Sequence, residues 1–261
     1  MILDRLAASA RKRVEEKKRR RPLTELQREA EAMEKNTGFP FRQALEAEGI
    51  SFICEVKKAS PSKGIIAEQF PYLEIAEDYQ AAGAAAISVL TEPEYFLGQD
   101  RYLKEIARQA AVPVLRKDFT VDPYQIYEAK VLGASAVLLI CSILSLEQLK
   151  EYLKLARGLG LSALVETHDS REIDLALEAG AGIIGVNNRN LQDFQVDVSN
   201  SLRLRELIPP GVLYVSESGV RTRRGVEILE QNGTDGVLIG ETLMRSPDRQ
   251  RTLRELKGGA G

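Results

Sequence analysis

The sequence predicts a single α/β domain, a (β/α)8 barrel preceded by a helical extension. Three observations predict it. Short apolar runs alternate regularly with longer helical patterns, polar residues follow the apolar runs, and the length of 261 residues suits this fold. Barrels of this class commonly span ~200–250 residues as one unit.

The apolar, β-branched runs begin at residue 51 and predict eight parallel strands. They end at residues 56, 90, 116, 140, 165, 186, 216 and 239, a spacing of 21 to 34 residues. A strand with its crossover helix needs about 30 residues. The predicted strands are Ser51–Val56, Ala86–Leu90, Val112–Arg116, Ala136–Ile140, Ser162–Val165, Ile183–Val186, Leu213–Ser216 and Gly236–Ile239.

Helices are expected between these strands, and glycines suited to helix C-termini precede several of the next strands. These glycines are Gly83, Gly133, Gly180 and Gly233. An open, doubly wound sheet is the alternative fold. Eight regular units, and the lack of a Gly-x-Gly-x-x-Gly motif between a predicted strand and the helix after it, favour the barrel.

Residues 1–48 precede the alternating strand and helix patterns. They predict a helical extension packed on the barrel domain of residues 49–258. Their centre, Arg11–Arg21, holds eight basic and two acidic residues, a local charge of +6. Such a run can bind nucleic acid. The acidic residues of 25–48 and the lack of interleaved aromatic residues favour a solvated face of one or two helices.

Composition narrows the functional classes. The formal net charge of −2 indicates no nucleic acid or membrane partner, and the early charges at the N-terminus argue against a secretory signal. Cys54 and Cys141 each lie in an apolar run, which suits reduced thiols in a cytoplasmic protein. With the single histidine His168 and no Cys/His cluster, no metal site is expected.

The first strand carries the most informative motif, Ile53–Gly64. Glu55 and Lys57 stand two residues apart, so they share one face of the strand near its end. The simplest interpretation is a structural ion pair. The other strand ends change that interpretation.

Six of the eight strand ends are polar. In this fold the carboxyl ends of the strands form the active site. A stable core gains nothing from gathering charge there, so these residues predict a catalytic site. Beyond the first strand they include Lys117, Glu166, His168, Asn187, Arg189, Glu217 and Glu241.

The last two strands lead into glycine-containing loops, Glu217–Val220 and Ile239–Leu243. Ordinary tight turns also use glycine. Glycine lets a phosphate approach the backbone, and a helix N-terminus favours an anion. Loops after strands seven and eight often bind phosphate in this fold, so they predict a phosphate site with Arg189 as a contributor. The predicted binding residues here are Arg189, Glu217, Ser218, Gly219, Gly240 and Glu241.

In order along the chain, these motifs resemble the indole-3-glycerol phosphate synthase family, a TIM-barrel family of tryptophan biosynthesis. The matching stretches are Glu55–Ser62, Ile87–Glu92, Tyr95–Gly98, Arg116–Phe119, Leu164–Glu166, Ile184–Leu191, Ser216–Gly219 and Ile239–Met244. The ordered set is far more specific than any one motif. Residues 1–48 match the family in character only.

The resemblance implies a cytoplasmic carboxy-lyase that converts 1-(o-carboxyphenylamino)-1-deoxyribulose 5-phosphate to indole-3-glycerol phosphate, CO2 and water. It implies no cofactor and no metal. The expected partner is a phosphorylated small molecule, with other tryptophan-pathway enzymes as further candidates.

The resemblance also implies roles for the strand-end residues. Lys117 is expected to be the acid that activates the ribulose carbonyl. Glu166 is assigned to the leaving hydroxyl and Glu55 to the base side. Lys57 is assigned to catalysis or to a substrate anion, and Asn187 to the sugar hydroxyls.

Further positions complete the expected site. Ser60 is expected at the anthranilate carboxylate, and Phe96 and Phe119 beside the aromatic ring, although both phenylalanines also suit a core. His168 is expected to be structural or peripheral to the site. Glu241 stands where smaller residues also occur in the family, so its backbone rather than its carboxylate is expected to meet phosphate.

Three other functions remain as alternatives. A phosphoribosylanthranilate isomerase needs an acid–base pair but no lysines at the strand ends. A Schiff-base aldolase would be trapped by borohydride at Lys117. A non-catalytic metabolite-binding barrel would bind without turnover, although no catalytic position is missing from the sequence.

Overall fold

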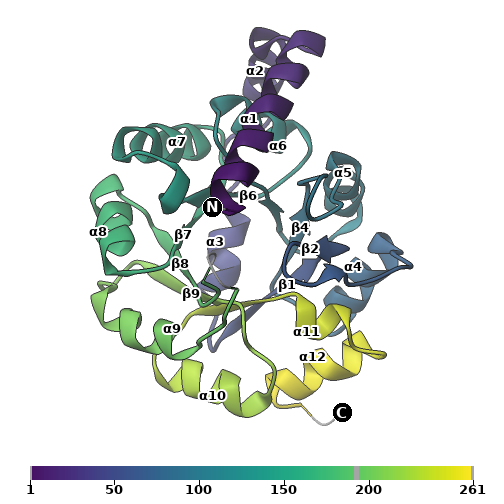
Figure 1. The fold of residues 1–261 in the computed structure, drawn as a ribbon, viewed down its shortest axis with the longest axis vertical. Coiled ribbons are helices and arrows are strands. Elements are labelled where there is room, and N and C mark those ends of the chain that lie inside the picture. Colours follow the sequence, from purple (N-terminus) through teal and green to yellow (C-terminus); the bar gives the residue numbers. More distant parts are fainter. Residues whose placement is uncertain (1, 191–193, 260–261) are drawn as a thin grey trace.

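The computed structural model describes residues 2–190 and 194–259 and contains a closed barrel of eight parallel strands (Figure 1). Around the barrel the strands follow the order β1, β10, β9, β8, β7, β6, β5, β4, so the predicted fold class is confirmed. The barrel strands are β1 (Ser51–Val56), β4 (Ala86–Leu90), β5 (Val114–Lys117), β6 (Ala136–Ile140), β7 (Ser162–Thr167), β8 (Ile183–Asn187), β9 (Leu213–Glu217) and β10 (Gly236–Ile239).

The crossover helices surround the barrel (Figure 1). The predicted glycines end four of them, with φ between 78° and 89°, a conformation that costs glycine little. The helices are α4 (Tyr72–Ala81), α5 (Asp100–Gln109), α6 (Pro123–Val131), α7 (Leu146–Gly158), α8 (Ser170–Ala179), α9 (Ser199–Leu204), α10 (Arg223–Gln231), α11 (Glu241–Met244) and α12 (Arg249–Lys257), with the 3-10 helices η1 (Cys141–Ile143) and η2 (Arg205–Leu207).

The strand boundaries differ from the prediction in two ways. β5 begins at Val114 rather than Val112, because Pro113 has no N–H to donate to a neighbouring strand. Strands β5, β7, β8 and β9 continue one or two residues beyond their predicted ends. Lys117, Glu166, Asn187 and Glu217 therefore lie on the strands themselves, where the sheet fixes their backbones.

The core has two layers. An outer layer of buried side chains fills the space between strands and helices, and a smaller cluster fills the barrel. The inner cluster includes Ile53, Leu115, Leu164 and Val215. Phe41 belongs to it although it comes from outside the barrel.

Among residues 2–48, three helices form the N-terminal extension, where one or two were expected: α1 (Ile2–Arg20), α2 (Leu23–Ala32) and α3 (Pro40–Leu45). Pro22 separates the first two, and Pro40 occupies the first turn of the third, where proline is well tolerated. Leu45 of α3 packs beside Gly236, the first residue of β10. Helix α3 therefore closes the amino-terminal end of the barrel.

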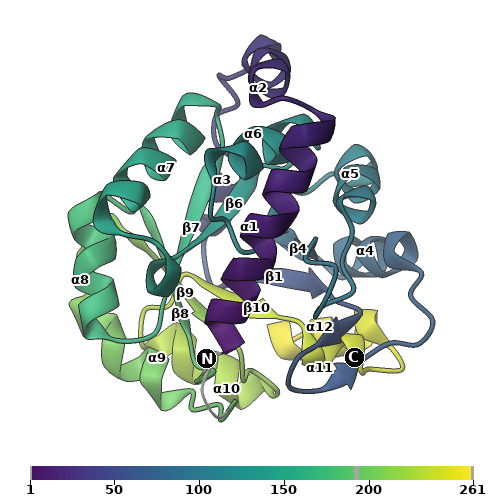
Figure 2. The ribbon, with the colours of Figure 1, turned by 45° about the horizontal axis from the view of Figure 1, so that its top comes forward.

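Helix α1 lies across the opposite end (Figure 2). Its basic run is not simply a solvated face. Arg13 donates to Asp118 at 2.6 Å, and the Lys17 ammonium lies 2.7 Å from Glu128. One face of the run thus pairs with carboxylates of the barrel domain. These carboxylates balance part of the positive charge of the run.

Within residues 2–190 and 194–259, no helix is both long and apolar enough to cross a bilayer. Leu191, the last residue of one family motif, lies outside the described residues.

Candidate active site

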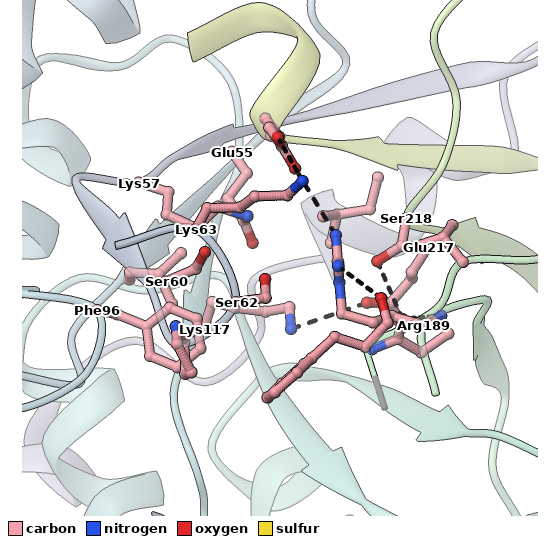
Figure 3. Close-up of a pocket in the computed structure, with 18 of the residues that line it drawn as sticks. Glu55, Lys57, Ser60, Ser62, Lys63, Phe96, Lys117, Arg189, Glu217 and Ser218 are labelled. Carbon is pink, nitrogen blue, oxygen red and sulfur yellow. Dashed lines mark hydrogen bonds and ion pairs between the residues drawn. The ribbon is translucent and has the colours of Figure 1, made fainter. Parts of the chain in front are cut away.

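A cavity of about 510 Å³ opens at the carboxyl ends of the barrel strands. Figure 3 shows the side chains that converge on it. Glu55, Lys117, Glu166, Asn187 and Glu217 all line this one cavity. The structure therefore brings these five strand-end side chains together, whereas His168 is not part of the cavity lining.

Lys117 lies among buried carboxylates. Its ammonium donates a hydrogen bond to Glu166 Oε2 at 3.2 Å and lies 3.8 Å from Glu217 Oε2. The side chains of Glu166 and Glu217 are only 4% and 2% exposed. Charges so far from water interact strongly, so the protonation of each group depends on its neighbours.

Opposing effects set the protonation of the lysine and its nearest carboxylate. Burial alone would lower the pKa of Lys117, but the charges of Glu166, Glu217 and Glu55 outweigh it and raise the pKa. Burial alone would raise the pKa of Glu166, but Lys117, His168 and a hydrogen bond from Asn187 lower it. The resting site therefore holds a charged lysine beside an ionised Glu166.

Glu217 behaves differently from Glu166. Burial and the negative charge of Glu166 raise its pKa to about 8, although Lys117 opposes them. The sequence placed Glu217 with the phosphate loops, but the structure directs its carboxylate into the lysine cluster. Gly185 on β8 makes room for it, since a Cβ there would collide with Glu217 Oε1.

Glu55 and Lys57 form the ion pair that their spacing predicted, with Lys57 Nζ donating to Glu55 Oε1. Gly240 at the end of β10 lies against this pair. A Cβ at position 240 would come within 3.0 Å of Lys57 Nζ and closer still to Glu55 Oε1. Glycine at 240 therefore gives the pair its space at the wall of the cavity.

Asn187 connects the carboxylate cluster to the loop after β9. Its Oδ1 accepts hydrogen bonds from Ser218 Oγ and from the Arg189 backbone N–H, each at 3.0 Å. Ser218 has a φ of 68°, which is unusual for a residue with a side chain, and Gly219 follows with 93°. A Cβ at Gly219 would lie 2.7 Å from Val196 Cγ1, so this turn requires glycine.

Glu241 holds the basic side chains beside the second glycine loop. Its carboxylate lies 3.8 Å from Arg189 Nη2, 3.7 Å from Lys63 Nζ and 3.2 Å from Arg245 Nε. Helix α11 is only four residues long, and α10 begins four residues after Gly219. Helix dipoles therefore contribute less to this region than expected, and cations and loop N–H groups contribute more.

Two phenylalanines form an aromatic wall. The ring centroids of Phe96 and Phe119 lie 6.1 Å apart, and both rings line the cavity. Glu92, only 1% exposed, accepts the backbone N–H groups of Tyr95 and Phe96 and thereby fixes the loop that carries Phe96. Both phenylalanines therefore lie in the cavity wall, and their contact with the aromatic ring of the substrate stays a prediction.

A buried polar network supports the strand that carries Lys117. Arg116 points away from the cavity and donates to Glu128 at 2.7 Å and to Asp100 at 3.0 Å. Asp118 accepts from Thr91 Oγ1 at 2.7 Å and from Arg13 of α1. The network therefore joins the N-terminal extension to β5 on either side of Lys117.

Ser60 also lines the cavity, from a short hairpin of β2 (Ala59–Ser60) and β3 (Gly64–Ile65). The sequence did not single out Lys63, on the same hairpin, or Ile2 and Leu6 of α1, which also line the cavity. The apolar periodicity of α1 signals a buried face, but only the fold shows where that face lies.

A charged lysine among buried carboxylates, with an aromatic wall and a basic loop region, defines an acid–base enzyme on a (β/α)8 barrel. The sequence profile of the family described as indole-3-glycerol phosphate synthase matches residues 3–256. The chain is 56% identical to the indole-3-glycerol phosphate synthase of Ruminiclostridium cellulolyticum over 260 residues, covering 100% of both chains. It is 55% identical to that of Endomicrobium trichonymphae over 98% of this chain and 100% of the relative.

The chain belongs to the indole-3-glycerol phosphate synthase family, as its motifs indicated. Among solved structures, the 3-hexulose-6-phosphate synthase of Salmonella typhimurium superposes with a TM-score of 0.66 at 14% identity, covering 80% of this chain and 97% of that one. At this identity the likeness supports the fold alone.

Proposed function

We propose that the lysine–carboxylate cluster performs the reaction of this family. The enzyme is a carboxy-lyase of tryptophan biosynthesis, and it converts 1-(o-carboxyphenylamino)-1-deoxyribulose 5-phosphate to indole-3-glycerol phosphate, CO2 and water. The observation that carries the assignment of residues is the position of Lys117 Nζ, 3.2 Å from Glu166 in a cavity with an aromatic wall.

Lys117 is the proposed acid for ring closure. The ribulose carbonyl must become electrophilic before the aromatic carbon attacks it, and an ammonium N–H donated to the carbonyl oxygen does this. The surrounding carboxylates keep the lysine charged. Loss of CO2 then restores the aromatic ring, and apolar walls assist by excluding water from the departing group.

Dehydration completes the reaction and needs an acid and a base. Glu166 is the proposed donor to the leaving hydroxyl, and Glu55 the proposed base for the proton on the neighbouring carbon. Asn187 is assigned to the sugar hydroxyls. Because Glu166 is ionised in the resting site, it must gain a proton before it acts as an acid.

The aromatic ring of the substrate is proposed to lie between Phe96 and Phe119, with its carboxylate near Ser60. Lys57 is assigned either to that carboxylate or to a catalytic step. The Lys57–Glu55 ion pair supports both assignments equally.

The phosphate is proposed to bind at the glycine loops after β9 and β10. Ser218, Gly219 and Gly240 offer backbone groups there, and Arg189 and Lys63 supply positive charge. The Glu241 carboxylate already pairs with both cations, so substrate phosphate must share them with it. Glu217 contributes to the lysine cluster rather than to these loops.

Replacing Glu241 by glutamine is expected to tighten phosphate binding. The change removes a negative charge that repels the phosphate and occupies Arg189 and Lys63. We expect the KM and the inhibition constant of inorganic phosphate each to fall about threefold to tenfold at low salt, with kcat little changed.

The matched control for this prediction is Glu255→Gln, which removes a similar surface partner of Arg251 on α12, outside the cavity lining. It should leave both constants unchanged. An unchanged or raised KM in Glu241→Gln would mean that this carboxylate organises the cations for phosphate instead of competing for them.

Carbon labelling tests the proposed function directly. Substrate labelled with carbon-13 in its carboxyl group should release one labelled CO2 for each indole formed. Label retained in a product, or an isomerised sugar without CO2 release, would contradict the proposal and favour the isomerase alternative.

We also propose that residues 1–48 are an extension of the barrel domain of residues 49–258 rather than a separate domain. The ion pairs from Arg13 and Lys17 to the barrel support this. Thermal unfolding followed by circular dichroism should show one cooperative transition, and two separate transitions would contradict it.

Cytoplasmic location and association with other tryptophan-pathway enzymes complete the proposal. Both cysteines are free and buried, which suits a reducing compartment. Fractionation of cells tests the location. Co-elution of the purified pathway enzymes with this protein tests the association, and independent elution would contradict it.

A further inference from the structure

His168, the single histidine of the chain, lies directly beside the proposed acid of the dehydration step. The two oxygens of Glu166 meet different partners. Oε2 accepts from Lys117 at 3.2 Å, and Oε1 lies 3.6 Å from His168 Nε2. That nitrogen is buried and has no hydrogen-bond partner among residues 2–190 and 194–259.

The other side of the imidazole ring is held by α8. Nδ1 lies 3.0 Å from Glu172 Oε2, and the same carboxylate oxygen accepts the His168 backbone N–H at 2.8 Å. Ser142 on η1 donates to the other oxygen of Glu172. Asn200 on α9 donates to the His168 carbonyl at 3.0 Å. These contacts fix the ring with Nε2 directed toward Glu166.

The charged groups around His168 favour its protonated form. Burial alone would lower its pKa, but the hydrogen bond to Glu172 and the charges of Glu166, Glu172 and Glu217 raise it. These carboxylates come from β7, α8 and β9. On η1, Ser142 Oγ lies 3.3 Å from His168 Nδ1, and burial raises the pKa of the adjacent Cys141 thiol to about 12, so the thiol stays neutral.

We propose that His168, held by Glu172, is a positioning residue for Glu166. Its imidazolium holds the Oε1 side of the carboxylate as Lys117 holds the Oε2 side. The charge of His168 thereby ties the protonation of Glu166 to solvent pH. This inference rests on the proposed role of Glu166 in dehydration, and it gives His168 a role beyond the structural one expected from the sequence.

The physical consequence is a mutual dependence between two titrations. A cation within ~4–6 Å lowers a carboxyl pKa by about 1–3 units, so loss of the imidazolium raises the proton affinity of Glu166. The coupling is reciprocal, so loss of the Glu166 charge must lower the pKa of His168 by the same amount. A histidine whose charge does not act on Glu166 would show neither effect.

The first test uses nuclear magnetic resonance of the intact protein, because one histidine gives one set of imidazole signals. We expect the pKa of His168 to be about 1 unit lower in Glu166→Gln than in the wild-type protein. Glu178→Gln is the matched control, since this exposed residue of α8 pairs with Lys150 instead. It should leave the His168 titration unchanged.

The second test uses the pH dependence of kcat in His168→Gln, with circular dichroism to confirm folding. Glutamine retains an N–H donor without the charge. We expect the limb of the profile that depends on protonated Glu166 to move to higher pH by about 1 unit. If the pKa of His168 is the same in the wild-type protein and in Glu166→Gln, the inference is overturned. This holds even if His168→Gln fails to fold.

The outcomes also separate this inference from the proposed function. A folded wild-type protein that forms no indole would contradict the proposed function. Normal indole formation with an unshifted pH profile in His168→Gln would contradict the inference alone.

Discussion

Replacing Lys117 by alanine is expected to lower kcat by roughly 10² or more while the barrel still folds. Lys117 is the only ammonium that the structure places within 4 Å of both Glu166 and Glu217, among the described residues. Alanine removes the proposed donor to the ribulose carbonyl and leaves the carboxylates without their cation. A 10²-fold loss corresponds to about 2.7 kcal/mol of transition-state stabilisation.

Steady-state kinetics measures kcat, and circular dichroism checks that the variant is folded. Lys150→Ala, on the exposed surface of α7, is the matched control because it removes an exposed lysine that pairs with exposed Glu178. Its kcat should be unchanged. Near-normal turnover in Lys117→Ala would exclude Lys117 from the mechanism.

Replacing Glu166 by glutamine is expected to lower kcat by a similar factor, roughly 10² or more. Glutamine keeps the size of the side chain but carries no transferable acid proton, so the hydroxyl cannot leave with its help. Since Lys117 remains in place, ring closure should be less affected than dehydration. An unprocessed hydroxylated intermediate should therefore accumulate, and chromatography of quenched reactions would detect it.

The control for Glu166→Gln is again Glu178→Gln, whose kcat should match that of the unchanged chain. Wild-type turnover by Glu166→Gln, or a lowered kcat without the intermediate, would count against the dehydration role. The second result would place Glu166 at ring closure instead.

The fold could be predicted closely because its signals are local. Each of the eight strands is a buried apolar run, and parallel strands of this kind read as continuous hydrophobic stretches. The start of β5 lies at Val114, later than expected, because Pro113 has no N–H to donate. The count of N-terminal helices was wrong because tertiary contacts stabilise the short helix α3, where Phe41 enters the barrel.

The site could be predicted only in part, because buried strands hide which face points inward. Leu115, Leu164 and Val215 lie in the inner cluster, and each stands two residues before Lys117, Glu166 or Glu217. This alternation is the signal that could have assigned Glu217 to the lysine cluster. Without the barrel, nothing in the sequence distinguishes that face from the face toward the helices.

Long-range contacts account for the remaining differences. Lys63 meets Glu241 across 178 residues of chain, and Leu6 reaches a cavity whose other walls begin at Glu55. His168 gains its position from Glu172 and Ser142, which lie on two different elements. No local pattern reports such contacts.

Indole fluorescence tests the central claim, that the Lys117 cluster closes an indole ring. The chain has no tryptophan and 8 tyrosines, so a newly formed indole is visible above the protein's own emission. With the carboxyphenylamino-deoxyribulose phosphate added to purified protein, indole emission should grow, and in Lys117→Ala it should grow at least ~10²-fold more slowly. A folded protein that binds phosphate without producing indole emission, or equal rates in both proteins, would contradict the claim.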